Sequence, residues 1–135
     1  MTVKAYLQQA RALDSRIDSE IRELEELRKL TAAVSSPSLK EHVQTSRSTN
    51  APFEQAYMRI VELEQKINGE IDRLVDLKEE IHDVICRLDD LDEQNVLVCR
   101  YLRNMTWEEI AEELHAAEST VFRWHNAALE HIVIP

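Results

Sequence analysis

Two long segments of the chain carry an apolar residue at every third or fourth position. The first covers residues 3–34 and the second residues 53–88. This spacing places the apolar side chains in one stripe along a helix. The first stripe contains Val3, Leu7, Ala10, Leu13, Ile17, Ile21, Leu24, Leu27 and Leu30; the second contains Phe53, Tyr57, Ile60, Leu63, Ile67, Ile71, Leu74, Leu77, Ile81, Val84 and Leu88. The stripes predict two long amphipathic helices.

The composition supports an all-α fold. Of the 135 residues, 44% are apolar and 31% are charged, and there is one glycine. That mixture is typical of long helices and coiled coils. The single glycine, Gly69, lies inside the second stripe, where it costs about 1 kcal/mol relative to alanine. Because the stripe continues on both sides of Gly69, we predict an uninterrupted helix.

Residues 35–52 interrupt the pattern and predict a flexible linker. They are rich in Ser, Thr and Asn and are bracketed by Pro37 and Pro52. Proline disfavours a helical conformation in the residue before it. We therefore predict an N-terminal long helix at 1–34, a linker at 35–52, and a second long helix at 53–88. Together they form a long antiparallel helical hairpin of coiled-coil character.

A hairpin of two helices leaves apolar surface uncovered, which raises the question of what covers it. Two chains that pair through the long helices would bury this surface in a bundle, and we expect such a homodimer. The alternative is that the hairpin folds against the C-terminal part of its own chain.

Residues 89–135 predict a C-terminal domain of three helices. The strings DLDE from Asp90 and TWEE from Thr106 match the capping box, so a helix begins at each. The first of these helices runs to Arg103, and Asn104 closes it in the left-handed conformation. After a turn at residues 116–118, Ser119 caps the last helix, residues 119–132. This layout is a helix-turn-helix, whose last helix enters the major groove of DNA.

The two faces of the predicted helix-turn-helix carry different residues. The predicted core is Trp107, Ile110, Ala111, Leu114, Val121, Trp124, Ala128 and Leu129. The predicted DNA-binding residues are Arg100, Arg103, Thr106, Ser119, Thr120, Phe122, Arg123 and Asn126. Arginine suits guanine and asparagine suits adenine, while hydroxyl groups at a helix start suit phosphate. Phe122 is left open between contact with a thymine methyl group and a place in the core.

The stretch RYLRNMTWEEIAEELHAAESTVFRWHNAALEHI, within Asp90 to Ile132, resembles region 4 of bacterial sigma factors. It is more similar to the small phage and prophage transcriptional regulators of the ArpU/RinA type and to related uncharacterised phage proteins. The matching residues are Arg100, Tyr101, Trp107, Glu108, Glu109, Ile110, Ala111, Leu114, Ser119, Thr120, Val121, Arg123, His125, Ala128 and Leu129.

This resemblance implies binding of double-stranded DNA and activation of phage genes, with RNA polymerase as a further partner. Base reading would fall on Ser119, Phe122 and Arg123, with Thr120 beside the phosphates. The string HAA from His115 replaces the glycine-containing turn common in that family.

The charge of the chain favours a second function. The net charge is −10, and residues 91–135 hold three arginines and no lysine against eight acidic residues. Because nucleic-acid binding depends on neutralised phosphates, any DNA contact must be local. The alternative function is a helical interaction protein that binds RNA polymerase or a sigma factor without reading DNA.

Other classes of protein lack sequence support. The five histidines form no HExxH and no i, i+4 pair, so we expect no metal, and we expect no enzyme and no cofactor. His125 is predicted to be a surface or phosphate-side residue. Cys86 and Cys99 form no CxxC motif, which indicates reduced thiols and a cytoplasmic protein. No apolar run approaches the roughly 20 residues of a membrane span, and the N-terminus lacks the apolar core of a signal peptide.

Overall fold

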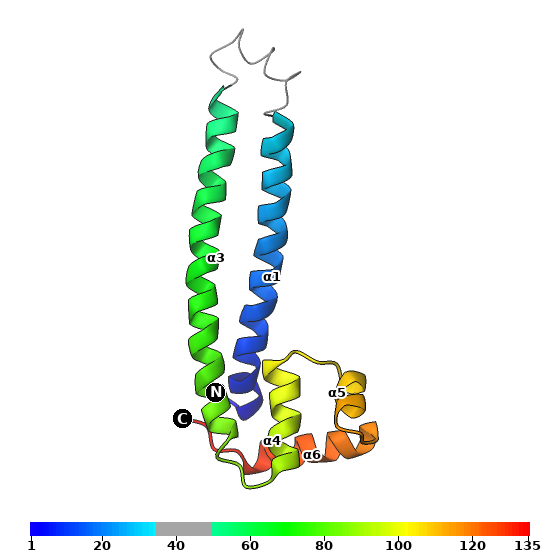
Figure 1. Ribbon diagram of the computed structural model, residues 1–135. Helices are drawn as coiled ribbons and strands as arrows, with labels where there is room; N and C mark the ends of the chain where they lie inside the picture. Colours follow the sequence, from blue (N-terminus) through cyan, green and yellow to red (C-terminus); the bar gives the residue numbers. More distant parts are fainter. Residues whose placement is uncertain (35–49) are drawn as a thin grey trace. The chain divides into compact units, whose positions relative to one another are not determined.

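The computed structural model describes residues 1–34 and 50–135, and its regular elements there are all helical (Figure 1). They are α1 (Val3–Val34), α3 (Asn50–Ile85), α4 (Leu91–Leu97), the π-helix η2 (Val98–Leu102), α5 (Trp107–Glu113) and α6 (Glu118–His131). The predicted all-α class is confirmed. Residues 35–49 of the predicted linker lie outside the described residues.

Helix α3 differs from its prediction at both ends. It begins at Asn50 and takes in Pro52, which we had assigned to the linker. Proline is tolerated in the first turn because the N–H groups there have no partner within the helix. The helix ends at Ile85, and a turn follows in which the Arg87 N–H donates to the Val84 carbonyl at 3.3 Å. It runs unbroken through Gly69, as predicted.

The described chain divides into two compact units. The first, here called the hairpin unit, is residues 15–72, and the second, here called the terminal unit, is residues 1–14 and 73–135. In the hairpin unit α1 and α3 run antiparallel (Figure 1). Their facing sides bury Ile17, Leu24, Ile60 and Ile67. These positions belong to the two predicted stripes.

Charged side chains also join α1 and α3 within the hairpin unit. The Lys66 ammonium lies 3.2 Å from the carboxylate of the buried Glu20, and the Arg28 guanidinium lies 2.5 Å from Glu64. A carboxyl–carboxyl hydrogen bond to Glu70 lowers the pKa of Glu20 and raises the pKa of Glu70. The buried Oε2 atoms of both have no other donor among the described residues, so the pair is satisfied when one carboxyl carries a proton.

The terminal unit packs the start of α1 with the C-terminal helices. The Arg11 guanidinium donates to the Arg100 carbonyl at 3.0 Å, and the Asn104 amide donates to the Asp14 carboxylate. Leu7 and Ala10 of α1 are fully buried. The first turns of α1 are therefore part of the core that supports residues 89–135.

Candidate nucleic-acid interface

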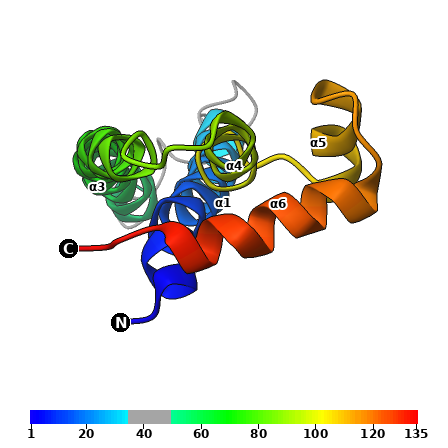
Figure 2. The ribbon, with the colours of Figure 1, turned by 90° about the horizontal axis from the view of Figure 1, so that it is seen from below.

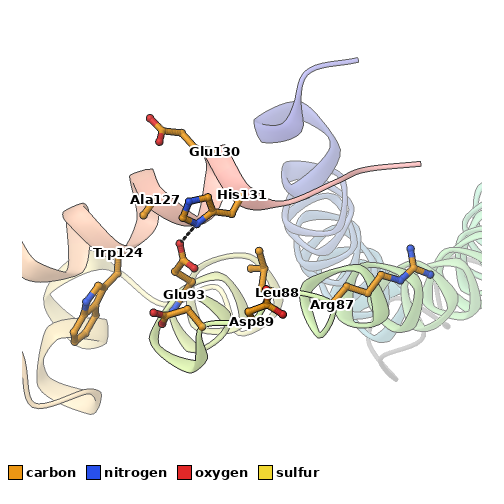
Figure 3. A pocket seen from close by; sticks show the side chains of 9 residues that line it. Arg87, Leu88, Asp89, Glu93, Trp124, Ala127, Glu130 and His131 are labelled. Atoms are coloured by element: carbon orange, nitrogen blue, oxygen red, sulfur yellow. Dashed lines mark hydrogen bonds and ion pairs between the residues drawn. The ribbon is translucent and has the colours of Figure 1, made fainter.

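The two predicted capping sites both begin helices. The Asp90 carboxylate accepts from the Glu93 N–H at 3.1 Å at the start of α4. The Thr106 hydroxyl oxygen accepts from the Glu109 N–H at 3.2 Å at the start of α5. Both N-caps are confirmed. Glu93 does not complete a capping box, because its carboxylate contacts His131 Nδ1 at 2.6 Å and so ties α4 to the end of α6 (Figure 3).

The helix that begins at Asp90 closes as predicted at Asn104 but by a wider last turn. Residues 98–102 are π-helical, and the Arg103 N–H donates to the Val98 carbonyl at 3.0 Å. Asn104 has a φ of 55°, the left-handed conformation expected of it. The apolar pattern of residues 98–102 does not distinguish this π-helical turn from an α-helical one.

His115 makes the turn between α5 and α6. Its φ is 51°, and the Ala116 N–H beyond it donates to the Ala111 carbonyl at 3.0 Å, which is the hydrogen bond of a Schellman motif. Histidine is several-fold enriched among non-glycine residues with positive φ, so it can take the place of glycine here. The motif ends α5 as sharply as a glycine would.

The predicted cap of α6 by Ser119 is wrong. The helix begins at Glu118, and its N-cap is Ala117, an extended residue that supplies no side-chain hydrogen bond. The left-handed His115 turns the chain two residues before this N-cap. Ile110 of α5 and Val121 of α6 are both buried in one cluster, which sets where α6 begins. Packing therefore overrides the capping preference of serine.

One apolar cluster holds α4, η2, α5 and α6 together. Val96, Cys99, Ile110 and Val121 are buried at its centre. The predicted core residues Trp107, Ala111, Leu114 and Trp124 are half-buried and pack against this centre; Ala128 is fully buried and Leu129 is half-buried. Figure 2 shows α6 passing beside α4 and α5.

His125 is buried, so its prediction as a surface residue is wrong. It is 6% exposed, and its Nε2 lies 2.7 Å from the Tyr101 hydroxyl of η2. Burial lowers the pKa of His125 and raises the pKa of Tyr101. The signal was present in the spacing, because His125 lies four residues after Val121 and three before Ala128, on the core face of α6.

Trp107 is the centre of a second set of contacts at the edge of the core. Its ring lies 4.8 Å from the ring of Phe122 and 4.8 Å from the ring of His125. The Arg100 guanidinium lies over the Trp107 ring at 4.4 Å and donates to the Met105 carbonyl at 3.1 Å. Burial lowers the pKa of Arg100. Arg100, expected on phosphate, is thus engaged inside the unit.

The opposite face of α6 exposes four of the predicted DNA-binding residues. Ser119, Phe122, Arg123 and Asn126 are exposed at positions i, i+3, i+4 and i+7, which lie on one side of a helix. We call these four residues the α6 stripe. Thr120 is half-buried beside it, while Arg103 and Thr106 are exposed on the segment that joins η2 to α5. The structure therefore brings four predicted residues together on one helix face.

Acidic residues limit where phosphate can approach. The four glutamates of α5, at 108, 109, 112 and 113, are exposed and turned away from the core. A groove beside the second half of α6 is lined by four carboxylates, those of Asp89, Asp90, Glu93 and Glu130, which outnumber the basic side chains of Arg87 and His131 there (Figure 3). Arg123 and Ser119 lie in the first half of α6, before this groove. Residues 119–126, which carry the α6 stripe, are therefore the part of α6 that suits a polyanion.

The residues that the structure describes hold neither a candidate metal centre nor a helix that could span a membrane. Over residues 1–34 and 50–135, no group of three or more His, Cys, Asp or Glu side chains is arranged to hold a metal ion. None of the described helices has an apolar stretch long enough to cross a membrane.

The comparisons with known proteins give one result. No curated protein and no solved structure matches the chain. A family model described as "Protein of unknown function (DUF1492)" matches residues 33–132, which are 100 of the 135 residues. The matched region contains α3 and every helix of the candidate interface. The chain belongs to the DUF1492 family.

Proposed function

We propose that this protein is a sequence-specific, DNA-binding transcriptional regulator of phage or prophage origin whose helix α6 enters the major groove. The observation that carries the proposal is the α6 stripe, exposed on a helix whose other face is packed on α4, η2 and α5. A helix held in this way presents its outer side chains in a fixed orientation. That is what base reading by a helix-turn-helix requires.

The chemistry of the α6 stripe fits base edges. The Arg123 guanidinium can donate two hydrogen bonds to guanine O6 and N7, and the Asn126 amide can pair with adenine N6 and N7. Ser119, at the start of α6, can donate to a phosphate together with the free N–H groups of the first turn. Since the acidic groove flanks the end of α6, beside Ala127, Glu130 and His131, the duplex contacts the helix from Ser119 to Asn126.

The hairpin unit supplies the proposed homodimer. Tyr57 is 56% exposed, Ile71 is 39% exposed and Ile21 is 36% exposed, although each is apolar and belongs to a predicted stripe. A second copy would cover these side chains, and two α6 helices would then read two half-sites separated by a whole number of turns of DNA. The protein would act in the cytoplasm, in keeping with its free thiols at Cys86 and Cys99.

The test is selection of bound sequences from a random duplex pool at about 100 mM salt, where screening reaches about 10 Å. The wild type is compared with Arg123→Ala and with Arg22→Ala, a matched removal of an exposed arginine on α1. The wild type and Arg22→Ala should enrich one motif, and Arg123→Ala should lose preference at one position of it. A palindromic motif would support the dimer. No enrichment by the wild type would contradict the proposal.

The acidic outer face of α5 favours a second candidate, in which the protein docks on RNA polymerase or a sigma factor without reading DNA. Four exposed carboxylates on two turns form a surface for a basic protein partner. In this case the immobilised protein would retain purified polymerase subunits. The double variant Glu112→Gln/Glu113→Gln would retain less, and a random duplex pool would show no enriched motif. Equal retention by both proteins would exclude this role for α5.

A further inference from the structure

Phe122 is the one large apolar side chain of the α6 stripe. It is 41% exposed, between the polar side chains of Ser119, Arg123 and Asn126. Leaving aromatic surface in water carries a free-energy cost that falls when an apolar group covers it. The core of the terminal unit covers it only in part, because Phe122 lies at the edge of the α6 stripe, about 100° around the helix from buried Val121, where its ring meets Trp107.

The Phe122 ring is held in position by its contact with Trp107. The two ring centroids are 4.8 Å apart and the planes are inclined at 50°. Trp107 is itself held by the Arg100 guanidinium at 4.4 Å and by the His125 ring, whose centroid lies 4.8 Å away with the planes inclined at 78°. A ring supported in this way loses little conformational entropy when it makes a further contact.

The major groove offers one apolar group to such a ring. The groove edges of guanine, cytosine and adenine present only hydrogen-bond donors and acceptors, whereas thymine adds its C5 methyl group. We propose that Phe122, supported by Trp107, contacts the C5 methyl group of a thymine and so determines specificity for thymine at one position of the site. This inference rests on the proposed function, because it requires α6 in the major groove.

The contact assigns Arg100 and Trp107 a positioning role. Neither lies on the α6 stripe, yet both fix the ring that meets the base. The contact should strengthen binding by the free energy of burying one methyl group, roughly 0.8 kcal/mol, which corresponds to about fourfold in affinity. Replacing thymine by uracil removes this methyl group and leaves every hydrogen-bonding atom of the base in place.

The experiment measures binding of the full chain to the enriched duplex, with each thymine replaced in turn by deoxyuridine. The wild type should lose about fourfold in affinity at one thymine, the size of one buried methyl group. Phe122→Ala should bind the thymine and uracil duplexes equally while keeping its response to changes at the guanine read by Arg123. Phe122→Leu, which keeps an apolar side chain, should retain part of the methyl dependence.

The contrary outcomes separate the inference from the proposed function. An enriched motif in which no thymine-to-uracil change weakens the wild type would overturn the Phe122 contact and leave DNA reading in place. The Phe122 contact would also be overturned if Phe122→Ala lost as much affinity as the wild type when that thymine is replaced by uracil. Absence of any enriched motif would overturn the proposed function and this inference with it.

Discussion

The hydrogen bond between Tyr101 and His125 makes a quantitative prediction about how α6 is held. The two groups lie 2.7 Å apart and both are buried. Tyr101→Phe removes only the hydroxyl and leaves His125 Nε2 without this partner. A buried polar group left unpaired costs about 1–3 kcal/mol. His125→Leu should cost a similar amount, because it leaves the Tyr101 hydroxyl unpaired.

The double variant decides whether the bond accounts for these costs. Tyr101→Phe/His125→Leu removes both polar groups and keeps side chains of similar size. Its loss of unfolding free energy should therefore be smaller than the sum of the two single losses by about 1–2 kcal/mol. The assay is urea unfolding followed by circular dichroism at about pH 8, where the free imidazole is neutral. Single losses that simply add would refute the reasoning.

The same pair predicts a dependence of stability on pH. Burial lowers the pKa of His125 in the folded state, so below its ordinary value of about 6.5 the unfolded chain binds a proton that the folded chain does not. Stability is therefore lost as the pH falls through this range, by at most about 1.4 kcal/mol per pH unit. In His125→Leu the free energy of unfolding should fall less steeply than in the wild type between about pH 7.5 and 5.5. An unchanged slope would show that His125 titrates normally.

Substitutions at three further positions test the helices and can be followed by the same unfolding assay. Gly69→Ala should raise the free energy of unfolding by about 1 kcal/mol, because an added Cβ meets no atom within 4 Å; a loss would mean that α3 bends there. His115→Ile should lower it by about 1–2 kcal/mol, since a β-branched side chain resists the φ of 51°, and His115→Gly should not; equal losses would argue against the left-handed turn. Because the pKa of Glu70 is raised in the folded state, the folded protein loses stability as the pH rises above the ordinary value of 4.5. Glu70→Gln removes this titration, so its free energy of unfolding should rise relative to that of the wild type over the same pH range. A difference between the two proteins that does not change with pH would show that Glu70 does not share a proton with Glu20.

Much of the fold could be predicted because helix-forming signals are local. The apolar stripes define both long helices, and the stripe through Gly69 outweighs the cost of one glycine. Asp90 and Thr106 mark helix starts because each side chain bonds an N–H three residues later, within the same short stretch.

The missed features depend on contacts between distant segments. Ser119 is a good cap in isolation, but the His115 turn and the burial of Ile110 and Val121 in one cluster move the N-cap of α6 two residues earlier, to Ala117. Glu93 belongs to a capping box by sequence and bonds His131 in the structure, 38 residues away. Arg100 looks like a phosphate ligand until the fold brings Trp107 under it. A single sequence does not reveal such pairs.

The proposed function requires α6 to read base edges in the major groove with its residues from Ser119 to Asn126. The most direct measurement is methylation interference on the enriched duplex, because dimethyl sulfate methylates guanine N7 in the major groove and adenine N3 in the minor groove. If Arg123 reads guanine, N7 methylation of one guanine in each half-site should block wild-type binding, and Arg123→Ala should be indifferent to it. Interference confined to adenine N3, or a guanine effect that Arg123→Ala retains in full, would contradict this requirement.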